Sequence, residues 1–238
     1  MIERRNRSVA AISIGPPRDL PPFAAFSVSH PSAPIPDLDS AEQKLLSASM
    51  VHSRREAFAR GRAAAHAALR TLGLDRGPIL SGPDREPLWW PGATGSISHA
   101  AGFGIALVAP TANTDGIGVD VEQLRHAPEL WEQVPREEER RWLERLNPRE
   151  REPGLLALFS AKESVFKAFF PRVRIFFGFE MASLVPDSLG FAGRLADGLD
   201  KDYPPERSFT VTCQWFEDIV LTSLVLPKTK SPFEVQRP

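Results

Sequence analysis

The apolar residues of this chain recur at helical spacing in two long stretches. In the first, about Val51–Leu72, they predict a buried face opposite a face that carries Arg54 and Arg62. Gly73 follows directly, where a left-handed residue commonly ends a helix. The second stretch is Pro153–Pro171, in which the first proline suits an opening turn and the last one stops the helix. We therefore expect two long amphipathic helices.

One charged residue lies in the middle of the apolar face of the second helix. At about 100° per residue, Glu163 projects between Phe159 and Phe166, with Lys162 at one edge of this face and Lys167 just beyond the other. A carboxylate on a core-facing stripe is unfavourable unless it is neutralised, ion-paired or bound to a metal. A salt bridge with a buried cation is the commoner solution. A metal site would require a second anionic group elsewhere in the chain.

Shorter apolar and β-branched runs predict two sheets. Phe103–Ala109 and Ile117–Glu122 are joined by a short polar loop, so we expect them to form an antiparallel pair. A further helix is expected at Trp131–Asn147. Four runs after the second long helix predict a second sheet: Phe179–Val185, Leu189–Leu195, Phe209–Phe216 and Ile219–Leu226.

These elements and the distribution of proline divide the chain into four parts. Residues 1–36 are expected to form an extended proline-rich arm without regular structure, since seven of the 23 prolines fall between 16 and 36. An N-terminal lobe is expected over 37–116, a C-terminal lobe over 117–227, and a loose tail over 228–238. The order helix, sheet, helix, sheet predicts an α+β fold of two similar-sized lobes, each an antiparallel sheet packed with a long helix.

Composition narrows the classes of function. The net charge of −1 provides no global basic field, so neither nucleic acid nor a membrane surface is an expected partner. No run of about 18 apolar residues predicts a membrane span, and the apolar run Val9–Ile14 is too short for a signal peptide. Cys213 is the only cysteine, which excludes an internal disulfide and a cysteine zinc site. We expect a cytoplasmic protein.

The strand Ile117–Glu122 supplies the second anionic group. Because side chains alternate along a strand, Asp120 and Glu122 lie on one face, about 6–7 Å apart at their Cβ atoms. Like charges that close repel unless a cation lies between them, and oxygen ligands suit Mg²⁺. An exposed pair of acids on an edge strand is the alternative at this point.

Several cations could gather around an anion near these acids: Arg62, Arg85, His99, Lys162 and Lys167. A divalent ion surrounded by cations is the arrangement that holds a polyphosphate and supports phosphoryl transfer. The sequence contains neither a P-loop nor a G-x-G-x-x-G pattern. For the arginines a solvated helix face, and for His99 a structural or surface role, are the alternatives.

Three motifs, in this order and at this spacing, resemble the signatures of the 4′-phosphopantetheinyl transferases of the long, two-lobed type. They are GSISHA at Gly95–Ala100, GIGVDVE at Gly116–Glu122 and FSAKESVFKAFF at Phe159–Phe170. The stretches Arg54–Leu69 and Arg85–His99 also resemble upstream blocks of the enterobactin-type subgroup. The resemblance covers about residues 54–179. It implies lobes related by a pseudo-twofold axis, with the active site at their junction.

The resemblance also implies an activity. Enzymes of this type move the phosphopantetheine arm of coenzyme A to a serine of an apo acyl or peptidyl carrier protein and release adenosine 3′,5′-bisphosphate. By match to the motifs, the ligands of Mg²⁺, or of Mn²⁺, would be Asp120, Glu122 and Glu163, and Glu163 is the candidate base. Seven residues would bind coenzyme A: Arg54, Arg62, Arg85, Ser98, His99, Lys162 and Lys167. A chain with both lobes is expected to be a monomer.

Two other functions are compatible with the same residues. A magnesium-dependent phosphohydrolase acting on a nucleotide like coenzyme A could use the same acids and cations without a carrier protein. A non-catalytic module that binds carrier proteins would contain the acids as structural groups.

Overall fold

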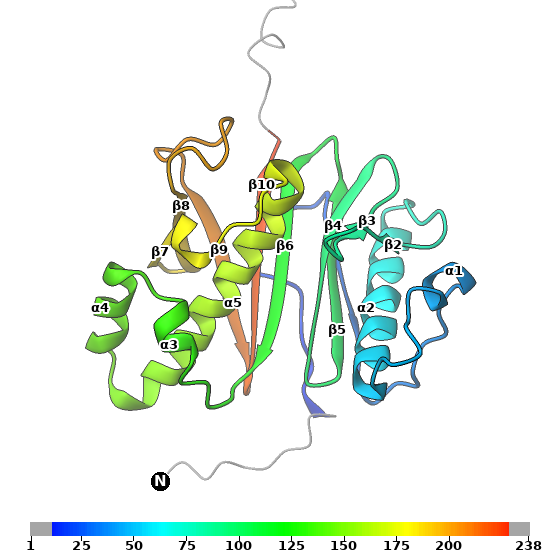
Figure 1. Ribbon diagram of the computed structural model, residues 1–238, viewed down its shortest axis with the longest axis horizontal. Helices are drawn as coiled ribbons and strands as arrows, with labels where there is room; N and C mark the ends of the chain where they lie inside the picture. Colours follow the sequence, from blue (N-terminus) through cyan, green and yellow to red (C-terminus); the bar gives the residue numbers. More distant parts are fainter. Residues whose placement is uncertain (1–10, 229–238) are drawn as a thin grey trace, which may run out of the picture.

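The computed structural model describes residues 11–228, which form two antiparallel sheets lying side by side, each covered by one long helix (Figure 1). Helix α2 (His52–Thr71) lies against the smaller sheet, and helix α5 (Pro148–Val173) crosses the larger one. This is the expected mixed α and β fold with two lobes. Within the described residues, no helix is long and apolar enough to cross a membrane.

The N-terminal lobe contains a three-stranded sheet in the order β1-β5-β4. Its strands are β1 (Ala25–Ser29), β5 (Phe103–Pro110) and β4 (Ala93–Ala100). Strand β1 lies inside the segment for which we expected no regular structure, and it pairs with β5 from Ala25 to Ser29. That expectation was wrong because no proline falls between 23 and 30, so every amide of this stretch can enter a ladder.

The remaining elements of this lobe are short. Helix α1 (Ser40–Gln43) precedes α2, and a small hairpin of β2 (Leu80–Ser81) and β3 (Pro87–Leu88) precedes β4. Helix α2 ends before Gly73, which has the expected positive φ of 66°.

The C-terminal lobe contains a five-stranded sheet in the order β6-β10-β9-β8-β7. Its strands are β6 (Thr114–Gln123), β7 (Ala182–Pro186), β8 (Gly190–Leu195), β9 (Phe209–Phe216) and β10 (Ile219–Pro227). The short 3-10 helix Phe179–Met181 leads into β7. The expected pairing of the two strands around the loop at 111–113 is wrong: β5 pairs with β1 and β4, while β6 pairs with β10. The loop therefore carries the chain from one lobe to the other.

Helix α5 is longer than its apolar period predicts. It begins at Pro148 with Asn147 as the N-cap, whose side chain accepts a hydrogen bond from the Arg149 amide at 3.0 Å. Pro153 and Pro171 both lie inside it. The single helix expected at Trp131–Asn147 is divided into α3 (Leu130–Gln133) and α4 (Glu137–Arg145), with Pro135 between them.

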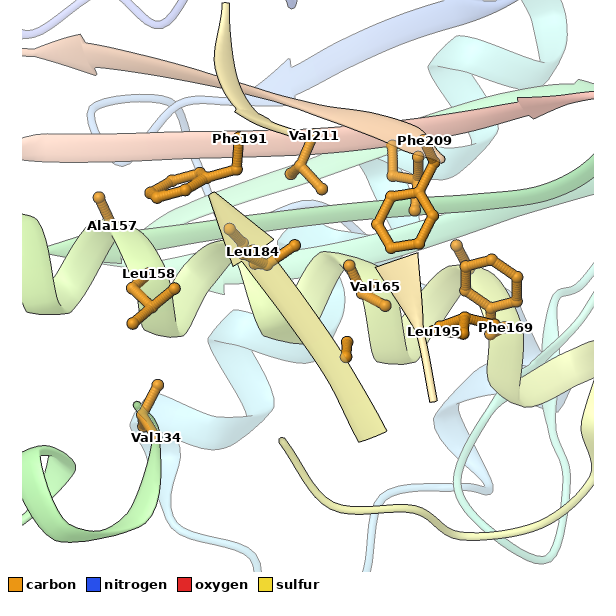
Figure 2. Packing of buried hydrophobic residues seen from close by; sticks show 14 of the residues in the cluster. Val134, Ala157, Leu158, Val165, Phe169, Leu184, Phe191, Leu195, Phe209 and Val211 are labelled. Atoms are coloured by element: carbon orange, nitrogen blue, oxygen red, sulfur yellow. The ribbon is translucent and has the colours of Figure 1, made fainter. Parts of the chain in front are cut away.

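The side chains of α5 pack against the larger sheet. Leu158, Val165 and Phe169 face a layer of side chains from β7, β8 and β9, among them Leu184, Phe191, Leu195, Phe209 and Val211 (Figure 2). On β6 the helix comes so close that a Cβ at Gly118 would lie 1.8 Å from the Ser164 carbonyl oxygen. The absence of a side chain at Gly118 thus fixes the distance between α5 and the strand that carries the acid pair.

A second hydrophobic cluster joins the two lobes. It combines residues of β5 in the smaller sheet with residues of β6 and β10 in the larger one, together with Ile12 and Ile14. Its fully buried members include Ile105 and Leu107 from one lobe and Val119 from the other. The junction beside the acid pair therefore has a core of its own. Apart from Lys228, the expected loose tail at 228–238 lies outside the described residues.

Candidate active site

The acid pair of β6 lies at the junction between the lobes. Asp120 is only 3% exposed, while Glu122 is partly buried. Strand β10 covers one edge of β6, and β4 of the other lobe packs close to β6 on the junction side. The alternative of two acids that simply face water is therefore excluded for Asp120.

Two donors from different lobes hold one oxygen of the Asp120 carboxylate. The Ser98 hydroxyl of β4 donates to Oδ1 at 2.8 Å, and the Lys167 ammonium of α5 donates to the same atom at 2.6 Å. Lys167 also donates to Ser98 Oγ at 3.2 Å and to the Val119 carbonyl at 3.3 Å. A serine, an aspartate and a lysine that are far apart in sequence thus form one contact group.

The surroundings of this contact group raise the pKa of two neighbouring carboxylates. Burial raises the pKa of Glu122 to about 7, and the charge of Asp120 adds to this shift. Burial also raises the pKa of Glu163; Lys167 opposes this shift and Asp120 adds to it. The three acids therefore lie within electrostatic reach of one another. A bound cation would favour the charged form of each.

One oxygen of Asp120 shows whether this contact group suits a metal ion. Across residues 11–228, two buried side-chain polar atoms lack a hydrogen-bond partner, and they are Asp120 Oδ2 and Arg62 Nε. Buried polar atoms are rarely left without a partner, so Oδ2 suits a ligand that the protein itself does not supply. Among the same residues, no three His, Cys, Asp or Glu side chains form a ready-made metal centre. The donor chemistry fits Mg²⁺, and Asp120 Oδ2 is the carboxylate oxygen that would be free to bind it.

Four of the expected cations surround two cavities beside this group. Arg54 and His99 line a cavity of about 590 Å³ at the start of α2. Arg85 and Lys167 line a second cavity of about 370 Å³, to which one lobe contributes the β2–β3 hairpin and β4 and the other contributes the end of α5. Although His99 keeps an exposed edge, burial of its ring lowers its pKa, and the charges of Lys167 and Arg54 lower it further.

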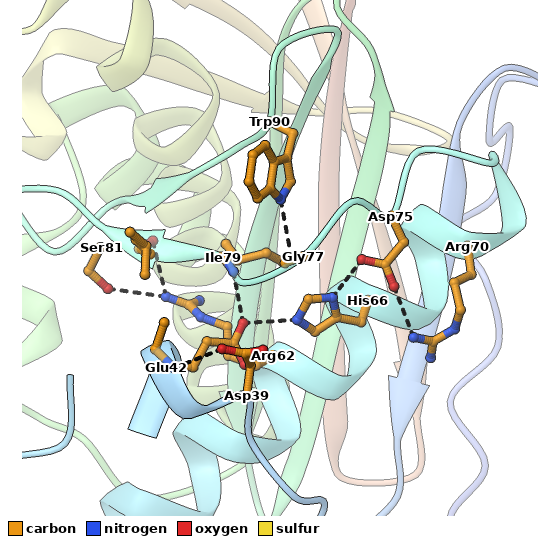
Figure 3. A network of polar contacts seen from close by, with 12 residues as sticks. Asp39, Glu42, Arg62, His66, Arg70, Asp75, Gly77, Ile79, Ser81 and Trp90 are labelled. Atoms are coloured by element: carbon orange, nitrogen blue, oxygen red, sulfur yellow. Dashed lines mark hydrogen bonds and ion pairs between the residues drawn. The ribbon is translucent and has the colours of Figure 1, made fainter. Parts of the chain in front are cut away.

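Arg62 is buried, whereas Arg54 at the start of the same helix is exposed. Arg62 is 5% exposed, stacks over the Phe58 ring at 4.5 Å and donates to the Ser81 hydroxyl at 3.1 Å. Figure 3 shows it beside Glu42 and bonded to Ser81, apart from the chain of contacts that runs through His66. In this conformation Arg62 supports the β2–β3 hairpin, although its unpartnered Nε leaves one donor for a ligand.

Lys162 is not part of this site. Its side chain is 1% exposed, and its ammonium lies 2.6 Å from Glu139 Oε2 and donates to the carbonyl oxygens of Phe179 and Ala182. The structure therefore corrects the expected contact with coenzyme phosphates: the ammonium joins α5 to α4 and β7. The buried face of α5 includes Ala161, Val165 and Ala168, so Lys162 points into the core, whereas Glu163 is only partly buried at its edge.

Some residues at the junction gave no signal in the sequence. Arg174 lines the 370 Å³ cavity, and its guanidinium lies 2.8 Å from Glu86 Oε1 across the two lobes. Phe166 contributes an aromatic wall to the same cavity. Ion pairs between residues 88 positions apart have no local pattern, and a phenylalanine on a helix is indistinguishable from a core residue before the fold is known.

The fold and this group define the class of protein: two α/β lobes with carboxylates from the C-terminal lobe and cations from both lobes at their junction. Residues 41–109 match the family model of the 4′-phosphopantetheinyl transferase N-terminal domain, and residues 116–209 match that of the 4′-phosphopantetheinyl transferase superfamily. The chain belongs to the 4′-phosphopantetheinyl transferase superfamily. The expected family and class of enzyme are thereby confirmed.

Individual relatives agree with this assignment. The chain is 33% identical to 4′-phosphopantetheinyl transferase PptT of Mycobacterium tuberculosis over 193 residues, which are 78% of this chain and 85% of that protein. It is 35% identical over 192 residues to enterobactin synthase component D of Salmonella typhimurium, covering 75% and 74%. Identity to the transferase Svp of Streptomyces mobaraensis is 40% over 149 residues, which span 61% of each chain.

Proposed function

We propose that this protein transfers the 4′-phosphopantetheine group of coenzyme A to a serine of an apo acyl or peptidyl carrier protein, with Mg²⁺ as the metal. The observation that carries the proposal is the contact group at the lobe junction, where Ser98 and Lys167 hold one oxygen of Asp120 and leave the other without a partner. Membership of the superfamily supports phosphopantetheine transfer as the reaction for which this contact group would be used.

The cations are suited to the phosphates of coenzyme A. Arg54 and His99 at one cavity and Arg85 and Lys167 at the other could each contact a phosphate. Together with Arg62, whose Nε has no partner, they would offset the charge of a ligand that carries several phosphates. Lys162 is left out of this set because its side chain is only 1% exposed and its ammonium is enclosed in the core, whereas the side chain of Lys167 is 25% exposed.

The metal would be held by Asp120, Glu122 and Glu163, with Mn²⁺ as a substitute for Mg²⁺. When bound, it would neutralise charge on the pyrophosphate of coenzyme A during transfer. Because both glutamates have raised pKa values, the metal would have to favour their ionised forms.

In the transfer step, the carrier serine oxygen forms a bond to the β-phosphorus as the bond to the departing adenosine 3′,5′-bisphosphate breaks. Serine is a poor nucleophile at neutral pH, so its proton needs an acceptor. Glu163 is our candidate, because it is partly buried, has a raised pKa and lies within electrostatic reach of Asp120. Its carboxylate would take the proton from the serine.

Replacing Glu163 tests this role. We expect Glu163→Gln to lower the transfer rate by at least about 100-fold, since general-base catalysis contributes roughly 10²–10⁴-fold, while stability is retained. Glu150→Gln, on the exposed first turn of the same helix, is the control and should transfer at the normal rate. Normal turnover in Glu163→Gln would remove Glu163 from the chemistry.

The function itself is tested by incubating the protein with coenzyme A, Mg²⁺ and an apo carrier domain. A gain of one phosphopantetheine in the mass of the carrier, abolished by EDTA, is the expected result. Bisphosphate without a mass gain would show a phosphohydrolase, and a carrier complex with no product would show a binding module. We expect the active species to be a monomer that needs neither nucleic acid nor membrane.

A further inference from the structure

Serine hydroxyls link β4 of one lobe to β6 of the other, without a shared ladder of backbone hydrogen bonds. Strands β4 and β6 belong to different sheets but pack against each other. Ser96 Oγ accepts a hydrogen bond from the Val119 amide at 3.0 Å and donates to the Val119 carbonyl at 3.4 Å. Two residues further along β4, Ser98 Oγ accepts from the Val121 amide at 3.4 Å. The two serines therefore occupy equivalent positions at the junction.

The hydroxyl of Ser98 has its hydrogen bonds fully assigned. A serine hydroxyl has one donor and two acceptor positions. Its acceptor positions are used by the Val121 amide and the Lys167 ammonium, neither of which can accept a hydrogen bond. Its proton is therefore directed to Asp120 Oδ1 at 2.8 Å. Ser98 is also 7% exposed, so it has no free donor for a coenzyme phosphate.

The two carboxylate oxygens of Asp120 differ in their hydrogen bonds. Oδ1 accepts from both Ser98 and Lys167, whereas Oδ2 is buried and has no partner. Two donors that converge on one carboxylate oxygen from two lobes restrict rotation of the carboxylate group. The orientation of Oδ2 is thus fixed before any ligand arrives.

We propose that Ser98 is a positioning residue for the metal ligand: by holding Oδ1 together with Lys167, it presents Asp120 Oδ2 to the divalent ion as a single, oriented ligand. This assigns Ser98 a role different from the coenzyme contact expected from the sequence. The inference rests on the proposed function, because that function supplies the metal. Groups that hydrogen-bond to metal ligands commonly contribute about 10–100-fold to metal affinity.

The equivalent serine provides a matched control. Ser98→Ala and Ser96→Ala each remove one hydroxyl from β4 and each leave one amide of β6 without its partner. Only Ser98→Ala also removes a donor from Asp120. A purely structural effect at the junction should therefore appear in both variants, whereas an effect on the metal ligand Asp120 should appear only in Ser98→Ala.

The test is Mn²⁺ binding to the full chain, measured by the loss of the free-ion signal in electron paramagnetic resonance, with and without coenzyme A. We expect Ser98→Ala to weaken Mn²⁺ binding by about 10-fold or more, and Ser96→Ala to stay within about twofold of the wild type. Equal dissociation constants for the two variants would overturn the inference, as would a wild type that binds no Mn²⁺ in either condition.

Two further measurements keep the test decisive. If Ser98→Ala does not fold, Ser98→Cys keeps the size of the side chain but is a weak donor, and it should weaken Mn²⁺ binding while Ser98→Thr restores it.

In transfer assays Ser98→Ala should raise the Mg²⁺ concentration needed for half-maximal rate and leave the rate at saturating Mg²⁺ within about threefold. A fall in that saturating rate with an unchanged Mg²⁺ requirement would contradict positioning. Failure of the proposed function is a separate result, in which the wild type adds no phosphopantetheine to the carrier.

Discussion

Lys162 and Glu163 are neighbours on α5, and their surroundings give them opposite roles. The Lys162 ammonium is enclosed by Glu139 and two carbonyl oxygens. Glu139 in turn accepts hydrogen bonds from the amides of Leu184 at 2.8 Å and Arg136 at 2.7 Å. Burial lowers the pKa of Lys162, and the charge of Glu139 opposes this shift. Each buried charge is compensated as long as both partners are present.

Removing both partners of this pair should therefore be less damaging than the sum of removing each one. We expect Lys162→Met and Glu139→Gln each to lower the free energy of unfolding by about 3–5 kcal/mol, because each leaves an uncompensated buried group. The double variant should lose less than the sum of the two. Urea unfolding of the four proteins measures this cycle. Additive losses, or a stable Lys162→Met that binds coenzyme A weakly, would return Lys162 to the ligand site.

The sequence could predict the acids of the site better than the lysines. Alternation along a strand places Asp120 and Glu122 on one face whatever surrounds them, and the structure has them there. The buried face of a helix depends on what packs against it. The large phenylalanines of α5 suggested a face centred on Glu163, but small residues such as Ser164 and Ala168 make the closest contacts. Small residues contribute little to an apolar pattern. The pattern therefore placed Lys162 at the edge of the buried face, although its side chain is buried.

At the scale of elements, a charged network holds α1 and the loop before β2 against α2. His66 on α2 lies between two carboxylates, with Nε2 2.9 Å from Glu42 Oε1 and Nδ1 2.9 Å from Asp75 Oδ1 (Figure 3). Hydrogen bonding to Glu42 raises the pKa of His66 against the effect of burial, and Asp75 adds to the shift. Glu42 is 1% exposed and also accepts from the Ile79 amide at 2.8 Å.

This network predicts a pH-dependent part of the stability. A histidine whose pKa is raised by folding stabilises the folded state fully below its unfolded pKa of about 6.5. That contribution is lost as pH rises through the raised value. We expect His66→Gln to lower the free energy of unfolding by about 1.5–3 kcal/mol at pH 6, the usual contribution of hydrogen bonds to charged groups, and by clearly less at pH 9.

Urea unfolding at both pH values measures the difference. His126→Gln is the control, because the His126 side chain is 83% exposed and its pair with Glu152 should contribute little at either pH. A loss in His66→Gln that is the same at pH 6 and pH 9 would show that the charge of His66 is not what stabilises the lobe.

The elements themselves were easier to predict than their partners. Both long helices and the strands of the larger sheet have local patterns, and the structure contains them close to the expected positions. Strand β1 and the pairing of β6 with β10 depend on residues between 75 and 113 positions away. Sequential strands joined by a short loop usually pair, but here the loop at 111–113 crosses between lobes. No local pattern distinguishes the two cases.

At the scale of the whole molecule, the lobes share the core on which the site depends. The cluster at the junction takes Ile105 and Leu107 from the smaller sheet and Val119 and Leu221 from the larger one, all at most 1% exposed. The contacts of Ser96 and Ser98 with β6 lie beside this cluster. Neither lobe could unfold alone without exposing apolar surface of the other.

We therefore expect the ligand-free protein to unfold in one calorimetric transition, with a van't Hoff enthalpy close to the calorimetric enthalpy. Leu107→Ala should lower the free energy of unfolding by about 2–5 kcal/mol, as expected for a fully buried leucine, and should keep a single transition. Because the core is shared, hydrogen exchange should then quicken equally in the most protected amides of α2 and α5, although the substitution lies in only one lobe. Leu69→Ala, in the separate cluster beneath α2, should do the same if the molecule is one cooperative unit. Two resolved transitions, or faster exchange confined to α2, would mean that the lobes are independent and that the junction can open without global unfolding.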